Sequence, residues 1–251
     1  MNMGRTTGIG WTNSTINFWI GCKKVSPGCK HCYAESLVTG RMARPFWPPW
    51  RTTTAYWRQP YQWKEHRMIF TCSLSDFFVG AEEGAPDVDA WRMDAWKVIK
   101  ETPQHTWQIL TKRPELIRKK LPPDWGPEGY PNVWLGATVE MQMYAEERIA
   151  SLLDVPAALH YVSAEPALTK LDLSRYLGPT KVAWVILGGE SQKGARPMDP
   201  EWARMLRDQA RDAKVPFFFK QIGGYPDAQA HEKALLDGAL YTEMPEVRAI
   251  V

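Results

Sequence analysis

Three cysteines lie close together near the start of the chain, in the segment GCKKVSPGCKHCY. Cys22, Cys29 and Cys32 are separated by six and then two residues. Three thiolates can hold three irons of a [4Fe–4S] cluster and leave the fourth iron open to an outside ligand. The same spacing suits a structural zinc site with His31 or Cys72 as fourth ligand, or three thiols that bind nothing. By itself the spacing leaves these three interpretations open.

Polar residues follow the apolar runs that we predict to be strands. The carboxyl ends of parallel strands meet at one edge of a sheet, where barrels and open α/β sheets bind their ligands. We therefore expect these residues to share one site, with ordinary turn chemistry as the alternative. The polar clusters are residues 73–76, 111–113, 138–140, 163–166, 188–191 and 220–221.

Short apolar runs separated by helical patterns must position these residues. The runs are nearly unbroken, which is typical of strands buried on both faces of a parallel sheet. Helical periodicity is clearest over residues 87–101, 140–153 and 199–214, and Asp199 is a candidate N-cap before Pro200. The predicted strands cover residues 16–20, 68–71, 106–110, 133–137, 159–162, 182–187 and 215–219.

These elements predict an α/β fold, a single-domain partial (β/α)6–7 TIM-like barrel over residues 1–224, with a C-terminal tail at residues 225–251. The 251 residues are enough for one sizeable core, and 44% hydrophobic with 24% charged residues exclude disorder, collagen and coiled coil. The net charge of +3 is only mildly basic and does not by itself indicate a nucleic-acid partner.

Residues 41–67 form an irregular aromatic and basic insert after the first strand. They hold four of the 13 tryptophans and six Lys or Arg against a single acid. Interleaved rings and cations suit a nucleic-acid strand, which makes Arg51, Trp57 and Arg58 candidate substrate contacts. The alternative is a lid whose rings pack on the barrel while the arginine stems reach water.

The compartment is expected to be the cytoplasm. The start of the chain lacks the apolar stretch of a signal peptide. The longest apolar runs have about six residues, whereas a membrane span needs about 20, so we expect no membrane partner. Four cysteines are too few for a disulfide scaffold.

Motifs spread from about residue 11 to residue 224 carry a family resemblance. On these motifs the chain resembles the radical S-adenosylmethionine superfamily, and it is similar to a phage and prophage family of radical-SAM-like proteins with no assigned substrate. The commonest superfamily spacing is C-x3-C-x2-C with an aromatic residue before the last cysteine. Here six residues fill the first gap and His31 holds the place of the aromatic residue. The motifs are GCKKVSPGCKHCYAE, SLSDFF, LTKRPE, WLGATVE, SAEP, LGGESQKGARPM and FFFKQIGG.

The resemblance implies that the three cysteines ligate a [4Fe–4S] cluster and that S-adenosylmethionine is the second cofactor. Reductive cleavage of S-adenosylmethionine would give a 5′-deoxyadenosyl radical, with an electron donor such as flavodoxin or ferredoxin. His31 or Tyr33 would stack on adenine. Of Ser73, Ser75 and Asp76 after the second strand, Asp76 is best suited to the methionine ammonium group.

Further roles follow from the same resemblance. Lys112 or Arg113 would bind the methionine carboxylate, and Glu165 the ribose hydroxyls. For each charged residue the alternative is a structural ion pair across the barrel mouth.

Other residues are candidates on the substrate side, namely Glu190, Arg196 and Lys220. Cys72 ends the second strand, where a thiol could return hydrogen to a product radical; the favoured alternative is a buried apolar role. The function predicted is a radical enzyme that modifies or repairs nucleic acid. The alternative is a zinc-stabilised, non-catalytic module that binds nucleic acid or a partner.

Overall fold

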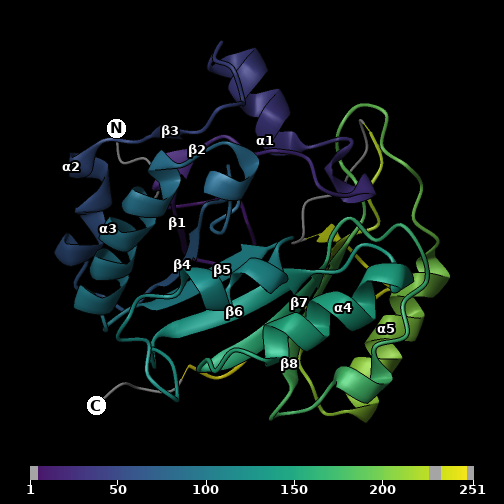
Figure 1. Ribbon diagram of the computed structural model, residues 1–251. Coiled ribbons are helices and arrows are strands. Elements are labelled where there is room, and N and C mark those ends of the chain that lie inside the picture. The colour runs from purple at the N-terminus through teal and green to yellow at the C-terminus, as the bar shows by residue number, and fades with distance from the viewer. Residues whose placement is uncertain (1–4, 226–232, 248–251) are drawn as a thin grey trace.

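Seven parallel strands form one curled sheet, in which each strand pairs with the next sheet strand along the chain (Figure 1). The computed structural model describes residues 5–225 and 233–247. Within them β1 and β9 are the two edges of the sheet, so the barrel stays open. The predicted partial TIM-like barrel is confirmed. The strands are β1 (Ser14–Ile16), β4 (Met68–Thr71), β5 (Thr106–Thr111), β6 (Val133–Thr138), β7 (Leu159–Ala164), β8 (Val182–Gly188) and β9 (Phe217–Gln221).

Three long helices cover the outer face of this sheet: α3 (Asp87–Glu101), α4 (Gln142–Leu153) and α5 (Pro200–Asp212) (Figure 1). One apolar cluster joins α3 to β4, β5 and β6, and a second joins α4 and α5 to β7, β8 and β9. Every residue of β4 and β6 is buried, as expected for strands covered on both faces.

Helix boundaries follow the local side-chain chemistry. At the start of α5 the Asp199 carboxylate accepts the N–H of Glu201 at 2.9 Å, so the predicted N-cap is confirmed. In contrast, α4 begins two residues later than its pattern predicts. Glu140 turns inward instead and pairs with the buried Arg148 at 2.5 Å.

Aromatic side chains fill the inside of the half-barrel. The ring centroid of Trp11 lies 4.6 Å from that of Phe70 and 6.1 Å from that of Trp184. Gly136 faces the ring of Tyr161, because a Cβ at this position would lie 2.4 Å from the ring. Packing inside the half-barrel therefore accounts for several of the 13 tryptophans. The same inner cluster also contains Met68, Trp134, Ile186 and Phe218.

The bounds predicted for the first strand are wrong. The end of residues 16–20 forms β2 (Trp19–Ile20), which pairs antiparallel with β3 (Trp50–Arg51) outside the main sheet. Asn17 separates the two parts, because its side-chain oxygen accepts the N–H of Leu74 at 2.8 Å and draws the chain toward the loop after β4. An apolar run does not reveal such a break, since its residues stay buried on both sides of it.

Short helical turns fill the remaining connections. The aromatic and basic insert, predicted to be irregular, contains two of them beside β3. The turns are η1 (Pro27–Cys29), α1 (Tyr33–Ser36), the π-helix η2 (Leu37–Arg41), α2 (Thr54–Trp57), η3 (Gln59–Gln62), η4 (Ala81–Glu83), η5 (Pro114–Leu116), η6 (Arg118–Lys120) and η7 (Ser174–Tyr176).

The described part of the C-terminal tail covers the β9 edge of the sheet. Thr242 bridges antiparallel to Phe218, and the N–H of Phe219 donates to Tyr241 O at 2.8 Å. Leu236 is buried against the cluster of α4 and α5. The tail therefore supplies backbone partners to the last strand.

No helix within residues 5–225 and 233–247 is long and apolar enough to cross a lipid bilayer.

Candidate functional site

The cysteine loop, residues 22–32, lies over the carboxyl edge of the sheet, between β2 and α1. Gly21 starts it: its N–H donates to Leu74 O at 3.0 Å, and it bridges to Ser75 beyond β4. Gly21 has φ +115, and an added Cβ would lie 2.6 Å from Phe46 O. Glycine is thus required where the chain turns into Cys22.

The three thiols are half-buried and close enough to interact electrostatically. Burial raises the pKa of Cys22 to about 12, helped by the Asp76 carboxylate and opposed by Arg113. Burial also raises the pKa of Cys32. The proximity of Cys29 also raises the pKa of both of the other thiols, so the three sulfurs are near enough to influence one another.

The donor set at this loop, three thiols in eleven residues, is of the kind that a [4Fe–4S] cluster takes. In the described part of the chain no three His, Cys, Asp or Glu side chains are grouped as one metal ion would need. A zinc ion requires about four ligands around one point, whereas cluster cysteines ligate different irons. Gly28 packs closely against Glu140, because an added Cβ would lie 3.0 Å from Glu140 Cγ and the glutamate would have to shift.

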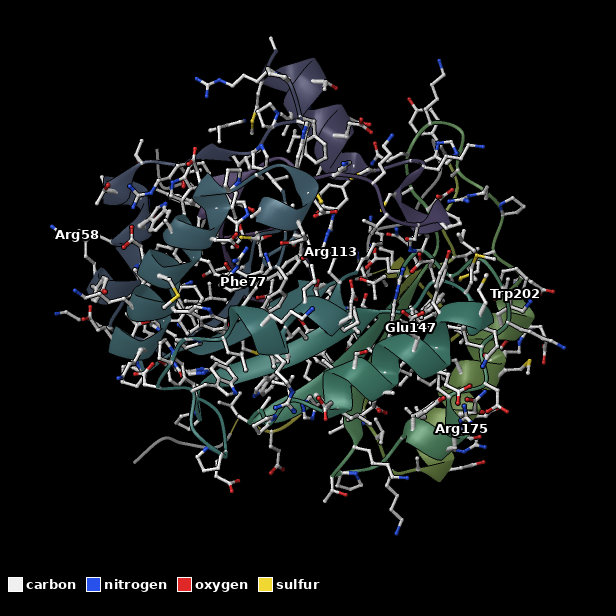
Figure 2. All side chains as sticks on the ribbon, in the orientation of Figure 1. Arg58, Phe77, Arg113, Glu147, Arg175 and Trp202 are labelled. Atoms are coloured by element: carbon white, nitrogen blue, oxygen red, sulfur yellow. The ribbon has the colours of Figure 1, made fainter. Side chains whose placement is uncertain are left out.

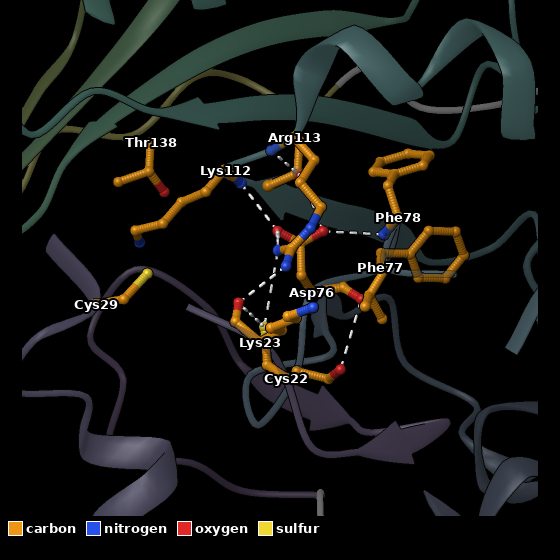
Figure 3. A network of polar contacts seen from close by, with 12 residues as sticks. Cys22, Lys23, Cys29, Asp76, Phe77, Phe78, Lys112, Arg113 and Thr138 are labelled. Carbon is orange, nitrogen blue, oxygen red and sulfur yellow. Dashed lines mark hydrogen bonds and ion pairs between the residues drawn. The ribbon is translucent and has the colours of Figure 1, made fainter. Parts of the chain in front are cut away.

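Arg113, two residues after β5, joins the cysteine loop to the acidic side chains beside it (Figure 3). It donates to Cys22 Sγ at 3.7 Å, to Lys23 O at 2.8 Å and to Asp76 Oδ2 at 3.1 Å. Its Nε and Nη2 both bond Glu83, each at 2.8 Å. A guanidinium has five N–H donors, and these contacts use them all.

Asp76 is saturated in the same way. Its Oδ1 accepts the N–H of Phe78 and the hydroxyl of Thr111 at 2.9 and 2.7 Å. Its Oδ2 accepts the N–H of Lys112 at 2.9 Å and the Arg113 bond. Burial would raise the pKa of Asp76, but Arg113 and these donors outweigh it and lower the pKa. In this arrangement Asp76 orients Arg113 and has no lone pair left for an ammonium group.

Lys112 keeps its charge available. Figure 3 shows its side chain extending toward Cys29 and Thr138. Its positive charge lowers the pKa of Cys32 against the effect of burial. Its ammonium has no hydrogen-bond or ion-pair partner in the described ranges, so of the pair Lys112 and Arg113 it is the cation free to bind a carboxylate.

The other residues predicted beside the cofactor bind the loop after β4. The hydroxyl of Tyr33 donates to Ser73 O, and that of Ser75 donates to Gly21 O. The side-chain amide of Asn17 donates to Ser73 Oγ at 3.1 Å. These bonds tie the cysteine loop and α1 to the end of β4.

The loop after β8 closes over the cysteine loop. Glu190 pairs with Arg196, whose Nη2 donates to Pro27 O at 2.9 Å. His31 packs against Gly194, since an added Cβ there would lie 3.1 Å from the imidazole. Burial would raise the pKa of Glu190, but its bonds from Arg196 lower it. We call these contacts the loop clamp; they occupy Glu190, Arg196 and one side of His31.

Glu165 and Lys220 face each other across β8, from the ends of β7 and β9, and form an ion pair. Their side chains are 24% and 18% exposed, so the pair is reachable from solvent. The structure thus brings both residues to the same edge as the cysteines, as the strand ends predict.

The later half of the insert lies away from this edge. Figure 2 shows Arg58 on the outer flank, far from Arg113. Arg51 stacks on Trp57 at 4.3 Å and pairs with Asp94 at 2.9 Å, and the Trp57 ring is buried. The structure does not bring Arg51, Trp57 and Arg58 into the candidate site.

The earlier half of the insert borders the cysteine loop. Phe46 O accepts the N–H of Cys22 at 3.1 Å. Beside it the Lys23 ammonium lies 5.8 Å from the Trp47 ring, and the Arg44 guanidinium lies 4.5 Å from the Trp50 ring. These two cation–aromatic pairs were not singled out from the sequence.

Cys72 belongs to the buried core. It is 2% exposed, packs in the cluster beneath α3, and has φ +61. Burial raises the pKa of its thiol to about 12. These facts agree with the favoured apolar interpretation of Cys72.

Sequence reasoning missed the partners that hold the site. Glu83 comes from η4, Asn17 from the end of β1, and Arg148 from α4. None lies in a strand-end cluster. The one signal in the sequence is Arg148, an arginine at an inward-facing position of its helix. That position does not identify the residue with which the arginine pairs.

Fold and site together define a class: an open parallel α/β half-barrel with a three-cysteine loop over its carboxyl edge. The chain belongs to the family described as a protein of unknown function (DUF5131), whose model matches residues 6–245. The predicted likeness to a phage and prophage family stays a prediction.

Two solved structures of spore photoproduct lyase variants are similar in fold. One, with a dinucleoside spore photoproduct, has a TM-score of 0.44 and 10% identity, covering 81% of this chain and 62% of the lyase chain. The other, with bound AdoMet and the same photoproduct, has a TM-score of 0.43 with the same identity and coverage. The chain thus spans less than two thirds of the lyase. A search of the curated proteins finds no match.

Proposed function

We propose that this protein is a radical S-adenosylmethionine enzyme of the cytoplasm. Cys22, Cys29 and Cys32 would hold a [4Fe–4S] cluster and leave one iron for S-adenosylmethionine. When bound, the cluster would pass one electron from a flavodoxin or ferredoxin to S-adenosylmethionine, cleaving its sulfur–C5′ bond to methionine and a 5′-deoxyadenosyl radical. The observation that carries the proposal is the placement of three interacting thiols over the carboxyl edge of a parallel half-barrel.

The chain's own residues have separate roles in this proposal. Lys112 is the free cation beside the cysteines and would bind the methionine carboxylate. Tyr33, at the start of α1 and more exposed than His31, would contact adenine. Glu165 would accept ribose hydroxyls from the edge of the site, with Lys220 as its partner. The aromatic floor of the barrel keeps water from below the site.

Anaerobic purification tests the proposal. We expect a brown protein that absorbs at about 400 nm, contains iron and sulfide, and forms 5′-deoxyadenosine with dithionite and S-adenosylmethionine. Cys29→Ala should abolish the product, whereas Cys72→Ala, a buried cysteine outside the loop, should keep it. Colourless protein with one zinc and no iron after reconstitution would favour the zinc-stabilised binding module instead.

For the substrate class we propose nucleic acid, modified or repaired by this radical. The supporting observation is the pair of cation–aromatic stacks at the cysteine loop, Lys23 on Trp47 and Arg44 on Trp50. Cations and partly exposed rings together suit phosphates and bases of a single strand. The groove beside Arg58 suits phosphates less well, because two of its three cations, Arg51 and Lys97, already pair with Asp94 and Glu101.

A matched pair of double variants tests this substrate class. We expect Lys23→Glu with Arg44→Glu to weaken salt-sensitive binding of a labelled single-stranded DNA or RNA by about tenfold or more. Arg51→Glu with Arg58→Glu reverses the same charge on the remote half of the insert and should change binding little. Absence of binding in the parent, or equal loss in both double variants, would reject nucleic acid.

A further inference from the structure

We propose that Arg113 is a positioning residue for the Cys22 sulfur, whose N–H donor raises the reduction potential of a cluster held through that sulfur. The inference rests on the proposed function, because it concerns how the same cysteines would hold a cluster. It assigns Arg113 a different task from binding the methionine carboxylate.

The hydrogen-bond inventory leads to this assignment. All five N–H groups of Arg113 have acceptors within the protein, and one of those acceptors is Cys22 Sγ at 3.7 Å. The side chain is 3% exposed, so water does not compete for these bonds. An external carboxylate could gain a bond only by displacing Asp76, Glu83 or the sulfur.

The guanidinium is held from three separate parts of the chain. Asp76 follows β4, and Lys23 O belongs to the cysteine loop itself (Figure 3). Glu83 ends η4. Asp76 is in turn fixed by Thr111 and two backbone N–H groups. The donor is therefore oriented toward Cys22 by the fold, before any metal is present.

Among the three cysteines, only Cys22 receives such a donor from a charged side chain in the described ranges. Cys29 Sγ lies 3.9 Å from Ser26 Oγ, and Cys32 feels the charge of Lys112 without a bond. Reduction adds negative charge to a cluster and its thiolates. An N–H donor in a dry site stabilises the reduced form more than the oxidised form, which raises the potential.

A redox titration without S-adenosylmethionine tests the assignment. We expect Arg113→Gln to shift the reduction equilibrium at least tenfold toward the oxidised form, about 59 mV more negative for a one-electron couple. Arg92→Gln is the matched control: Arg92 is also a buried arginine, but its bonds go to Asp89 and to the carbonyls of Phe77 and Val79 rather than to the cysteine loop. It should leave the potential unchanged.

A second measurement covers the case in which Arg113→Gln folds poorly. In wild-type protein carrying 15N-labelled arginine, pulsed EPR of the reduced cluster should detect a 15N coupling. The coupling should disappear in Arg113→Lys, which keeps the charge, and persist in Arg92→Lys.

The outcomes separate this inference from the function on which it rests. A bound cluster whose potential and 15N signal are the same in the Arg113 variants would overturn the inference alone. Unchanged potential with weaker S-adenosylmethionine binding would overturn it and assign Arg113 to the methionine carboxylate. Wild-type and Arg92→Gln proteins that bind no cluster would remove the proposed function, and this inference with it.

Discussion

Gly21 occupies a backbone conformation that other residues rarely adopt, directly before the first cysteine. A Cβ there would meet two backbone atoms, Phe46 O at 2.6 Å and Pro49 Cα at 2.9 Å. We expect Gly21→Ala to lower the free energy of unfolding by about 1–3 kcal/mol and to reduce the iron content after reconstitution. Denaturant titration and iron analysis measure both effects. Gly40→Ala, with no atom within 4 Å of the new Cβ, is the control; equal losses would contradict the argument.

Asp89 gives the fold a dependence on pH. Burial would raise the pKa of Asp89, but bonds from Arg92, Lys120 and the N–H of Ala81 outweigh it and lower the pKa below 3.8. A carboxyl with a lowered folded pKa stabilises the protein above its unfolded pKa, and that contribution is lost as the pH falls through the folded pKa. Because the Asp89 side chain is 39% exposed, solvent screens part of this contribution, and we expect Asp89→Asn to cost about 1 kcal/mol at pH 7 and less at about pH 3.

Urea unfolding at the two pH values checks this expectation for Asp89. Asp94→Asn is the control. The Asp94 side chain is 61% exposed, so its ion pair with Arg51 should contribute less than about 1 kcal/mol to the free energy of unfolding. A pH-independent loss in Asp89→Asn would argue against the electrostatic explanation.

The residue types at the site could be predicted, but their partners could not. Strand ends and the cysteine spacing marked Asp76, Arg113 and Cys22 as members of one edge. The bond from Arg113 to Cys22 forms because two loops meet above the sheet. The sequence alone does not show which loops lie close together in space. Glu190 and Arg196 are a similar case, because the bond from Arg196 to the cysteine loop goes to a backbone atom, Pro27 O.

Two loops meet in the loop clamp, and its strength can be measured. Arg196, held by Glu190, is the donor to Pro27 O. We expect Arg196→Gln to speed tryptic cleavage at the exposed lysines of the cysteine loop by about threefold or more, because the loop opens more often. Mass spectrometry of the fragments measures it. Arg175→Gln removes an arginine with an exposed partner and is the control; equal acceleration would refute the clamp.

Most strands could be predicted because their apolar runs are bounded by polar clusters; β4 has the predicted bounds, and five others overlap their predictions. The first strand could not, since Asn17 redirects the chain inside an apolar run. The insert failed for a related reason. The aromatic and basic composition is the same along the whole insert, so it suggests a single surface. Packing instead divides the insert into a half beside the cysteines and a half against α3.

An open barrel has edges, and the tail pairs with one of them. Tyr241 O accepts the N–H of Phe219, and the N–H of Glu243 donates to β9. We expect a chain ending after Leu240 to lose about 1–3 kcal/mol of unfolding free energy and to self-associate through the uncovered strand. Denaturant titration and sedimentation velocity at several concentrations measure this. Glu246→Gln, at an exposed position, should behave as wild type, and a monomeric truncated chain would contradict the expectation.

The strand order of the sheet is the order of synthesis, so each strand can dock on its predecessor as the chain leaves the ribosome. Trp11 is the exception. It precedes every strand of the sheet, yet it packs against Tyr161 and Trp184, which are made much later. Until β7 and β8 have been made, Trp11 has Phe70 of β4 but neither of these two rings to pack on, so the inner aromatic cluster is completed only when the later strands dock.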